Sequence, residues 1–465
     1  MKKHLLAWLF LLFSVGSWAQ DAELTGSWSG SLDVMGQKLP LVFHFEKLNG
    51  GWKGTADSPA QGAKGLALKN ILFNGLMAAW EFEQIPALYE GVMVGDTLKG
   101  NFTQSGTTFS LELIRVSEAS VATDLQRPQE PRPPFDYEEI ETSFVNTAGQ
   151  LKLVGTVTKP KGTGPFPAVV LVSGSGPQNR NGELLDHQPF WVLADHLTKN
   201  GIVVFRYDER GVGESEGDFS QATSYDLKGD ANDAIAHLRK FPFVDQVKVG
   251  AIGHSEGGMI GWMLAAENAI DFLVALAAPV LPIDQFMEQQ TKDVLRVSGA
   301  DEKLFEERLT LNKKVYAAVK NTEKMEDLEG NLKTMIREHL AEVGVDTNDL
   351  DKETTAIMNA FAPTVSPWFF EFLKFSAETY IRQIDIPVFA AFGGKDIQTN
   401  APANIEALRK FTADRGHLFN VTTYPSLNHL FQTAETGSVA EYGTITETFN
   451  EKVMEDIVKW LKSLM

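Results

Sequence analysis

A serine flanked by glycines is the residue of this chain best placed to act as a nucleophile. Ser255 lies in Gly253-His254-Ser255-Glu256-Gly257, after the β-branched run 247–252 and before an apolar helical pattern. A serine at such a strand-to-helix turn occupies a strained backbone conformation, and the glycines let neighbouring backbone pass close by. The pattern predicts that the turn exposes the Ser255 hydroxyl for attack on a substrate.

A second G-x-S-x-G match, residues 213–217, has different surroundings. It follows residues 207–210 and runs into residues 218–220, so no strand directly precedes it and no amphipathic pattern directly follows it. We interpret this second match as a loop.

The Ser255 motif resembles that of α/β-hydrolases with a serine nucleophile, in which an acid and then a histidine follow the serine along the chain. Asp396 comes at the carboxyl end of the β pattern 388–392, and His429 comes just past that of 418–424. Catalytic groups collect at this edge of parallel sheets. Asp385 and His417 precede the same two strands and so belong at the opposite edge. The resemblance therefore implies a catalytic triad of Ser255, Asp396 and His429.

The roles of the three residues follow from the chemistry of acyl transfer. Ser255 attacks the acyl carbonyl, His429 takes its proton and returns it to the leaving alcohol, and Asp396 orients the imidazole. The tetrahedral oxyanion requires two main-chain donors. We expect these to be the N–H of Glu256 and, from the loop 173–180, the N–H of Ser175.

Four motifs are similar to those of bacterial carboxylesterases of the EstD type, which also resemble serine aminopeptidase-like hydrolases. The motifs are residues 174–178, the pattern Asp208-x-Arg210-Gly211-x-Gly213, residues 253–258 and residues 427–432. The resemblance runs from about Asp136 to the C-terminus, and Ser173 departs from it, because a His-Gly pair often opens this loop in the family. We expect Asp208 and Arg210 to form a structural ion pair, and the side chains of His254 and Glu256 to be structural.

The helices and strands that must position these residues are predicted to form an α/β domain over residues 136–465. A hairpin (140–145 and 151–158) precedes strands at 168–172, 202–207, 247–252, 272–277, 388–392 and 418–424, with helical patterns at about 187–200, 225–240, 403–413 and 450–464. This alternation predicts a mostly parallel sheet flanked by helices. The helical, charged stretch at about 281–378 predicts a lid. Its aromatic cluster, 368–375, is assigned to the lid core in preference to the acyl pocket.

The region 20–118 predicts a separate antiparallel β domain. Short alternating strands broken by glycine and turn residues indicate a small barrel or sandwich of about seven or eight strands. A proline-rich linker, 119–135, is expected to be extended and semi-rigid. The first 19 residues have the charged, apolar and small-residue parts of a signal peptide with cleavage after Ala19, which predicts a secreted or periplasmic protein.

The amino-acid composition limits the classes of partner and cofactor that the protein is expected to bind. Lys and Arg number 42 against 61 Asp and Glu, a net charge of −19 that disfavours nucleic acid and anionic membranes. With no cysteine, lipidation at a lipobox, disulfides, cysteine-bound zinc and a thiol nucleophile are excluded. The apolar run near the N-terminus is too short for stable membrane insertion. No metal-ligand spacing or phosphate-binding loop is present, so no cofactor is expected, and the oligomeric state is left open.

The sequence favours a serine carboxylesterase that acts on small-molecule esters with small to medium acyl chains. Two alternatives stay open. An aminopeptidase or amidase would use the same triad and would need carboxylates that grip an amino terminus, for which Glu288, Glu306, Glu307 and Glu371 of the lid are candidates. Alternatively, the β domain binds an envelope glycan or lipid and carries the hydrolase with it.

Overall fold

The computed structural model describes residues 24–34, 37–48, 51–58, 63–104, 107–116, 127–297, 299 and 302–464. The expected signal peptide lies outside these residues. The chain divides into two compact units, the first of which contains the eight N-terminal strands. No helix within the described ranges is both long enough and apolar enough to cross a bilayer.

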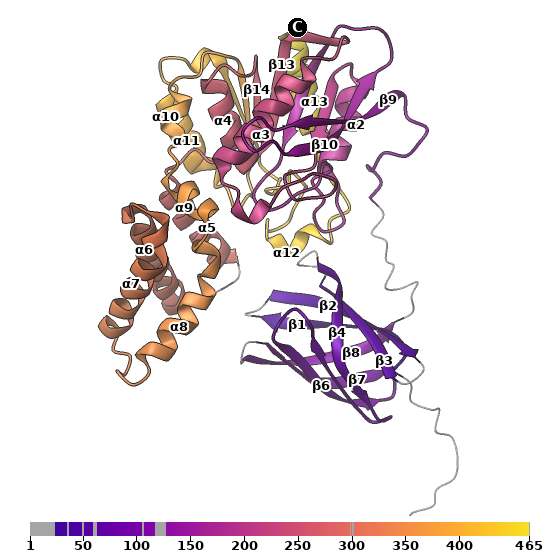
Figure 1. Ribbon diagram of the computed structural model, residues 1–465, viewed down its shortest axis with the longest axis vertical. Helices are drawn as coiled ribbons and strands as arrows, with labels where there is room; N and C mark the ends of the chain where they lie inside the picture. Colours follow the sequence, from indigo (N-terminus) through magenta and orange to yellow (C-terminus); the bar gives the residue numbers. More distant parts are fainter. Residues whose placement is uncertain are drawn as a thin grey trace, which may run out of the picture. The chain divides into compact units, whose positions relative to one another are not determined.

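The first unit is a closed antiparallel barrel, so the choice between barrel and sandwich is settled in favour of the barrel (Figure 1). Its strands, each paired with the next and the last with the first, are β1 (Gly26–Val34), β2 (Gln37–Leu48), β3 (Gly51–Ser58), β4 (Ala63–Phe73), β5 (Met77–Phe82), β6 (Ala87–Val94), β7 (Thr97–Gln104) and β8 (Thr107–Val116). Large side chains fill the interior: Trp28, Phe43, Trp80 and Tyr89 are fully buried. The barrel is therefore a packed core, as small barrels commonly are.

The second unit is built on an eight-stranded sheet in the order β16-β15-β14-β13-β11-β12-β10-β9. The strands are β9 (Tyr137–Val145), β10 (Lys152–Pro160), β11 (Phe166–Val172), β12 (Val203–Tyr207), β13 (Val244–His254), β14 (Leu273–Leu276), β15 (Val388–Gly393) and β16 (Phe419–Tyr424). The hairpin β9–β10 joins β12 in antiparallel register, and the six strands from β11 onward are parallel. The expected mostly parallel sheet is confirmed.

Helices cover both faces of this sheet. On one face, α2 (Pro189–Lys199) and α13 (Glu451–Ser463) pack on apolar side chains such as Val169 and Val274. On the other, α3 (Ser224–Leu238), α4 (Glu256–Ala266) and α11 (Ala401–Phe411) pack on the alternate side chains. The central strands are buried on both faces, which explains their nearly continuous apolar sequences.

A helical insertion separates the neighbouring strands β14 and β15, close to the expected lid at 281–378 (Figure 1). It consists of α5 (Ile283–Val297), α6 (Glu302–Asn321), α7 (Leu328–Glu342), α8 (Leu350–Ala360), α9 (Pro367–Lys374) and α10 (Ala377–Ile381). Helix α7 contacts both α6 and α8, and α9 packs on α5 and α6. Although the insertion interrupts the chain, β14 and β15 pair directly, with Leu273 opposite Val388.

The second half of the proline-rich segment is packed on the second unit instead of spanning a gap. The buried Arg127 guanidinium donates to the carbonyl oxygens of Leu185 (3.1 Å) and Gly443 (3.0 Å), among others. Gln129 accepts the N–H of Thr448 at 2.6 Å. A buried charge must be compensated by hydrogen bonds, and these carbonyls supply them. Arg127 and Gln129, which belong to the expected linker 119–135, are therefore packed on the second unit.

Candidate active site

The backbone at Ser255 is strained in the way that the sequence pattern predicts. Ser255 stands between the end of β13 and the start of α4, with φ +54° and ψ −117°. Its N–H donates to the carbonyl oxygen of Leu276 at 2.8 Å, which fixes the turn to β14. A non-glycine residue at positive φ persists only where its surroundings impose it, and such residues cluster at functional sites.

Glycine is required beside this turn because backbone segments approach closely. A Cβ at position 257 would lie 2.0 Å from the carbonyl oxygen of Val172, and one at position 253 would lie 2.1 Å from the carbonyl oxygen of Gly257. The start of α4 is thus pressed against the end of β11. This contact places Ser255 beside the loop that follows β11.

Asp396 and His429 form a buried pair at the carboxyl ends of β15 and β16. Asp396 Oδ2 lies 2.8 Å from His429 Nδ1, and Asp396 Oδ1 accepts the N–H groups of Gln398 (2.8 Å) and Thr399 (2.7 Å). The carboxylate side chain is fully buried, and the imidazole is 6% exposed. With Nδ1–H donated to the carboxylate, Nε2 is left as the proton acceptor that a general base needs.

Ser255 and His429 line the same cavity, of about 270 Å³. Its wall is mainly apolar and includes Leu184, Phe190, Phe286, Met287, Trp368, Phe372, Leu430, Tyr442 and Phe449. The two residues set aside in the sequence lie elsewhere. Asp385 forms an ion pair with Arg415 at 3.5 Å, and His417 lies in the turn Gly416–Leu418 that precedes β16. Ser255 and His429 thus share one cavity, and Asp396 contacts His429 without lining that cavity itself.

The two residues expected to supply the oxyanion donors also line this cavity. Glu256 is the first residue of α4, where backbone N–H groups have no acceptor within the helix. Ser175 belongs to residues 173–180, which we call the oxyanion loop and which follow β11 directly; both residues line the cavity. A Cβ at Gly174 would lie 3.3 Å from Ser255 Cβ, so the loop runs directly against the serine.

The side chains that flank Ser255 are buried and engaged in hydrogen bonds. Burial, together with nearby His429, lowers the pKa of His254 to about 3, so the imidazole is neutral and its Nε2 lies 2.8 Å from the carbonyl oxygen of His429. Glu256 Oε1 accepts from Ser224 Oγ (2.5 Å) and from Trp368 Nε1 (2.8 Å). Burial raises the pKa of Glu256, although these hydrogen bonds oppose the rise. Glu256 thereby connects the nucleophile turn to helix α9.

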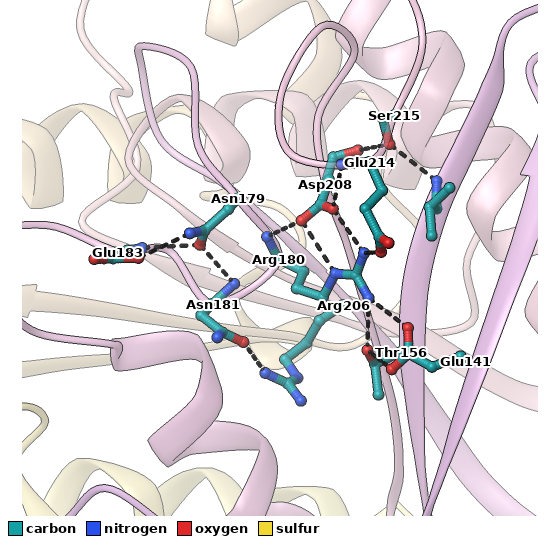
Figure 2. Close-up of polar contacts among 11 residues, drawn as sticks. Glu141, Thr156, Asn179, Arg180, Asn181, Glu183, Arg206, Asp208, Glu214 and Ser215 are labelled. Carbon is teal, nitrogen blue, oxygen red and sulfur yellow. Dashed lines mark hydrogen bonds and ion pairs between the residues drawn. The ribbon is translucent and has the colours of Figure 1, made fainter.

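The expected ion pair between Asp208 and Arg210 is wrong. Asp208 pairs with Arg180 at 2.7 Å, as Figure 2 shows, and Arg210 pairs with Asp230 at 2.7 Å. Both arginines are nearly buried, at 15% and 11% exposure, and each is matched by a carboxylate on another segment. Sequence spacing could not identify these partners, because the pairing depends on how the loops pack. Arg180 is a member of the oxyanion loop that the sequence left without a role.

The second G-x-S-x-G match is structural. Ser215 Oγ donates to the carbonyl oxygen of Asp208 at 2.7 Å and accepts the N–H of Val154 at 2.9 Å (Figure 2). This hydroxyl thus donates to one main-chain group and accepts from another. Ser215 belongs to a loop, as predicted.

The lid contributes aromatic side chains to the cavity and no carboxylate from the four proposed. Trp368 and Phe372 line it, with ring centroids 4.8 Å apart, whereas Phe369 and Phe370 are buried in the core. The aromatic cluster therefore serves both packing and the cavity wall. Glu288 instead pairs with Lys313 at 3.4 Å, outside the cavity lining. Within the described ranges, histidines and carboxylates form no group placed to hold a metal ion.

Comparison with known proteins places this arrangement in a family. The family model described as serine aminopeptidase, S33, matches residues 188–431. Esterase EstD from Thermotoga maritima is 26% identical over 326 residues, which cover 70% of this chain and 68% of that protein. Among solved structures, the Pyrococcus furiosus esterase PF2001 has 16% identity and a TM-score of 0.42, over 70% of this chain and 91% of that chain. Hypothetical protein PA2218 from Pseudomonas aeruginosa has 13% identity and a TM-score of 0.46, over 74% and 98%. Because the family model spans more than half of the sequence, the chain belongs to the serine aminopeptidase S33 family of α/β-hydrolases, with a closed β-barrel before the hydrolase unit.

Proposed function

We propose that this protein is an exported serine carboxylesterase that cleaves small to medium esters through an acyl-enzyme on Ser255. The observation that carries the proposal is the common cavity of Ser255 and His429, with His429 held by Asp396 at 2.8 Å. The similarity to an esterase supports the choice of substrate bond.

The proposed reaction uses each part of the site in turn. His429 Nε2 removes the proton of Ser255 as Oγ attacks the acyl carbonyl, and the N–H groups of Glu256 and Ser175 stabilise the oxyanion. The protonated imidazole then donates to the leaving alcohol, and Asp396 stabilises its positive charge. Water attacks the acyl-enzyme by the same route and releases the acid.

The cavity wall favours uncharged substrates of modest size. It is mainly apolar, and among the residues that line it in the described part of the chain there is no lysine or arginine to bind an anionic group. A space of about 270 Å³ is at the small end for a ligand site. We therefore expect short neutral esters to be turned over faster than long-chain or acidic ones.

The peptidase activity in the family description is the competing candidate. An aminopeptidase must bind a free ammonium group. Of the Glu256 carboxyl, which does line the cavity, Oε1 is engaged by Ser224 and Trp368, and burial raises the pKa, which disfavours the anionic form that would bind an ammonium group. Burial of this carboxyl and the two hydrogen bonds to Oε1 favour the esterase. Parallel assays with a short-chain 4-nitrophenyl ester and with aminoacyl-4-nitroanilides separate the two, because faster turnover of the anilides would refute the ester assignment.

Replacement of the nucleophile tests the mechanism. The variant Ser255→Ala is expected to fold with an unchanged circular dichroism spectrum and to lose turnover of a short-chain 4-nitrophenyl ester. Ser215→Ala is the matched control, because Ser215 lies in the same type of motif and its hydroxyl is bound to main chain. Equal turnover by Ser255→Ala and wild type would eliminate the proposed mechanism.

Export has its own test, independent of catalysis. The proposal predicts that protein recovered from the periplasm or medium begins at Gln20, after removal of the first 19 residues. N-terminal sequencing of that protein measures this directly. An intact N-terminus on protein found only in the cytoplasm would contradict export.

A further inference from the structure

Two consecutive carboxyl groups at the end of β12 hold the backbone of the oxyanion loop. Glu209 Oε2 accepts the N–H of Gln178, and Asp208 Oδ1 accepts the N–H of Arg180, both at 2.8 Å. The N–H of Glu209 in turn donates to the carbonyl oxygen of Gln178 at 3.2 Å. The loop is thus bound at alternate residues by neighbours from a different strand.

Asp208 is the more heavily bonded of the two. Its carboxylate also accepts from Arg180 Nε (3.1 Å) and Nη2 (2.7 Å) and from the N–H of Glu214 (3.1 Å), as Figure 2 shows. Burial raises the pKa of Asp208, but these hydrogen bonds outweigh burial and leave the pKa below its ordinary value. Asp208 is therefore an ionised acceptor surrounded by donors.

Glu209 holds the loop with a pKa that is shifted in the opposite direction from that of Asp208. It is 4% exposed, and burial raises its pKa well above the ordinary value, although the N–H of Gln178 opposes the rise. Burial thus favours the protonated acid, whose carbonyl oxygen accepts a hydrogen bond without carrying a charge. Because a carboxamide has the same shape and also accepts, glutamine is the natural substitute at this position.

The bonded residues bracket the part of the loop that faces Ser255. On one side, the loop begins at the end of β11, where Val172 pairs with Gly253 of β13. On the other side, Gln178 is held by Glu209. Between them, Gly176 has φ +91°, a conformation that keeps the turn tight. The N–H of Ser175 lies within this short, doubly anchored segment.

We propose that Asp208 and Glu209 are positioning residues for the oxyanion hole, which act by fixing the loop that carries the Ser175 N–H. The inference rests on the proposed function, since it assigns a purpose to that N–H. A displaced donor weakens the interaction that exists only in the transition state, so the effect is expected on kcat and not on KM.

Four variants of the holding residues test the proposal on the full-length protein with a short-chain 4-nitrophenyl ester. Glu209→Ala and Asp208→Ala are expected to lower kcat about 10- to 100-fold, at most as much as the loss of one oxyanion donor would, and to leave KM within about twofold of wild type. Glu209→Gln is expected to restore kcat to within about threefold of wild type, because its amide oxygen accepts the same N–H. Asp208→Asn is expected to fall between Asp208→Ala and wild type, because its amide oxygen can accept the N–H of Arg180 whereas its NH₂ cannot accept from the Arg180 guanidinium.

A stability control separates positioning from a general structural role. Thr198→Val removes the buried hydrogen bond of 2.6 Å between Thr198 and Thr158. The hydroxyls of these two threonines bond to each other and to main chain outside the oxyanion loop, so the variant is expected to lower Tm and to leave kcat unchanged. The proposal is overturned if Glu209→Ala and Asp208→Ala keep wild-type kcat, or if Glu209→Gln is as slow as Glu209→Ala. If Ser255→Ala is inactive and either of these results is obtained, only the positioning role is refuted. If Ser255→Ala is active, the proposed function itself is refuted.

Discussion

His254 Nε2 lies 2.8 Å from the main-chain oxygen of His429, so the residue before the proposed nucleophile holds the backbone of the proposed base. The two rings are 4.7 Å apart between centroids. Because burial lowers the pKa of His254 to about 3, this imidazole stays a neutral donor across the ordinary pH range. The turn at Ser255 and the loop at His429 are therefore connected without any contribution from the reacting atoms.

The acid of the triad gives the first prediction. Asp396→Asn is expected to lower kcat about 10³- to 10⁴-fold, because an amide at Oδ2 no longer holds Nδ1–H and stops stabilising the imidazolium. Steady-state kinetics with a short-chain ester measure the effect. Asp385→Asn is the matched control: this exposed aspartate, at the opposite end of β15, contacts Arg415 at 3.5 Å and is expected to leave kcat unchanged. A larger loss from the control than from Asp396→Asn would exclude Asp396 as the acid.

The close approach at Gly257 gives the second prediction. Gly257→Ala is expected to reduce activity at least tenfold and to lower stability by about 1–3 kcal/mol, because its Cβ would meet the Val172 carbonyl at 2.0 Å and force α4 from β11. Gly330→Ala, in α7 with no atom within 4 Å of the added Cβ, is expected to stabilise by about 0.5–1 kcal/mol. Urea unfolding and esterase assays on both variants check this, and an active, stable Gly257→Ala would show that the contact can relax.

The aromatic wall gives the third prediction. Trp368 stacks on Phe372 and donates to Glu256, and both aromatic residues line the cavity. Trp368→Ala is expected to lower kcat/KM about tenfold for a two-carbon acyl ester and less for a six- to eight-carbon ester, because the emptied space accepts a longer chain. Trp368→Phe keeps most of the ring and is expected to keep the wild-type order of substrates. An equal loss for all chain lengths in Trp368→Ala would argue against a role of the wall in selectivity.

The buried His187 gives the fourth prediction, on acid stability. Burial lowers the pKa of His187 to about 4, against the opposing hydrogen bond with the carbonyl of Tyr442, whereas an unfolded histidine titrates near 6.5. Between these two values the unfolded chain binds a proton that the folded protein does not, so stability falls as pH falls. For wild type, the free energy of unfolding should drop by about 1.4 kcal/mol more per pH unit in this window than for His187→Gln. Urea unfolding at pH 7 and pH 4.5 measures it, and a constant gap between the two proteins would contradict the assignment.

The sequence predicts the scaffold well because local signals and topology agree. The strand-to-helix alternation, the turn at Ser255 and the places of Asp396 and His429 after two strands could all be read from patterns of a few residues. The same patterns left the barrel and the sandwich equally possible, since closure depends on whether β1 meets β8, residues far apart in the chain.

Side-chain pairing was beyond the sequence for the same reason. Asp208 and Arg210 are two residues apart, yet each takes a partner from another segment, Arg180 and Asp230. Arg127 reads as part of a solvated proline-rich stretch, but four carbonyl oxygens from two distant segments surround it. Such contacts are fixed only when the loops are packed, and no spacing rule anticipates them.

The insertion leaves the sheet after β14 and returns to it at β15, the strand that pairs with β14. Its entry and exit are thus adjacent, and the entropy of closing such a detour grows only with the logarithm of its length. Helices can be gained, lost or exchanged at this point while the sheet beneath keeps its hydrogen bonds. Ser255, Asp396 and His429 all lie outside the detour, whereas Trp368 and Phe372 lie inside it. Substitutions within the insertion can therefore change substrate selectivity while the residues assigned to bond cleavage stay the same.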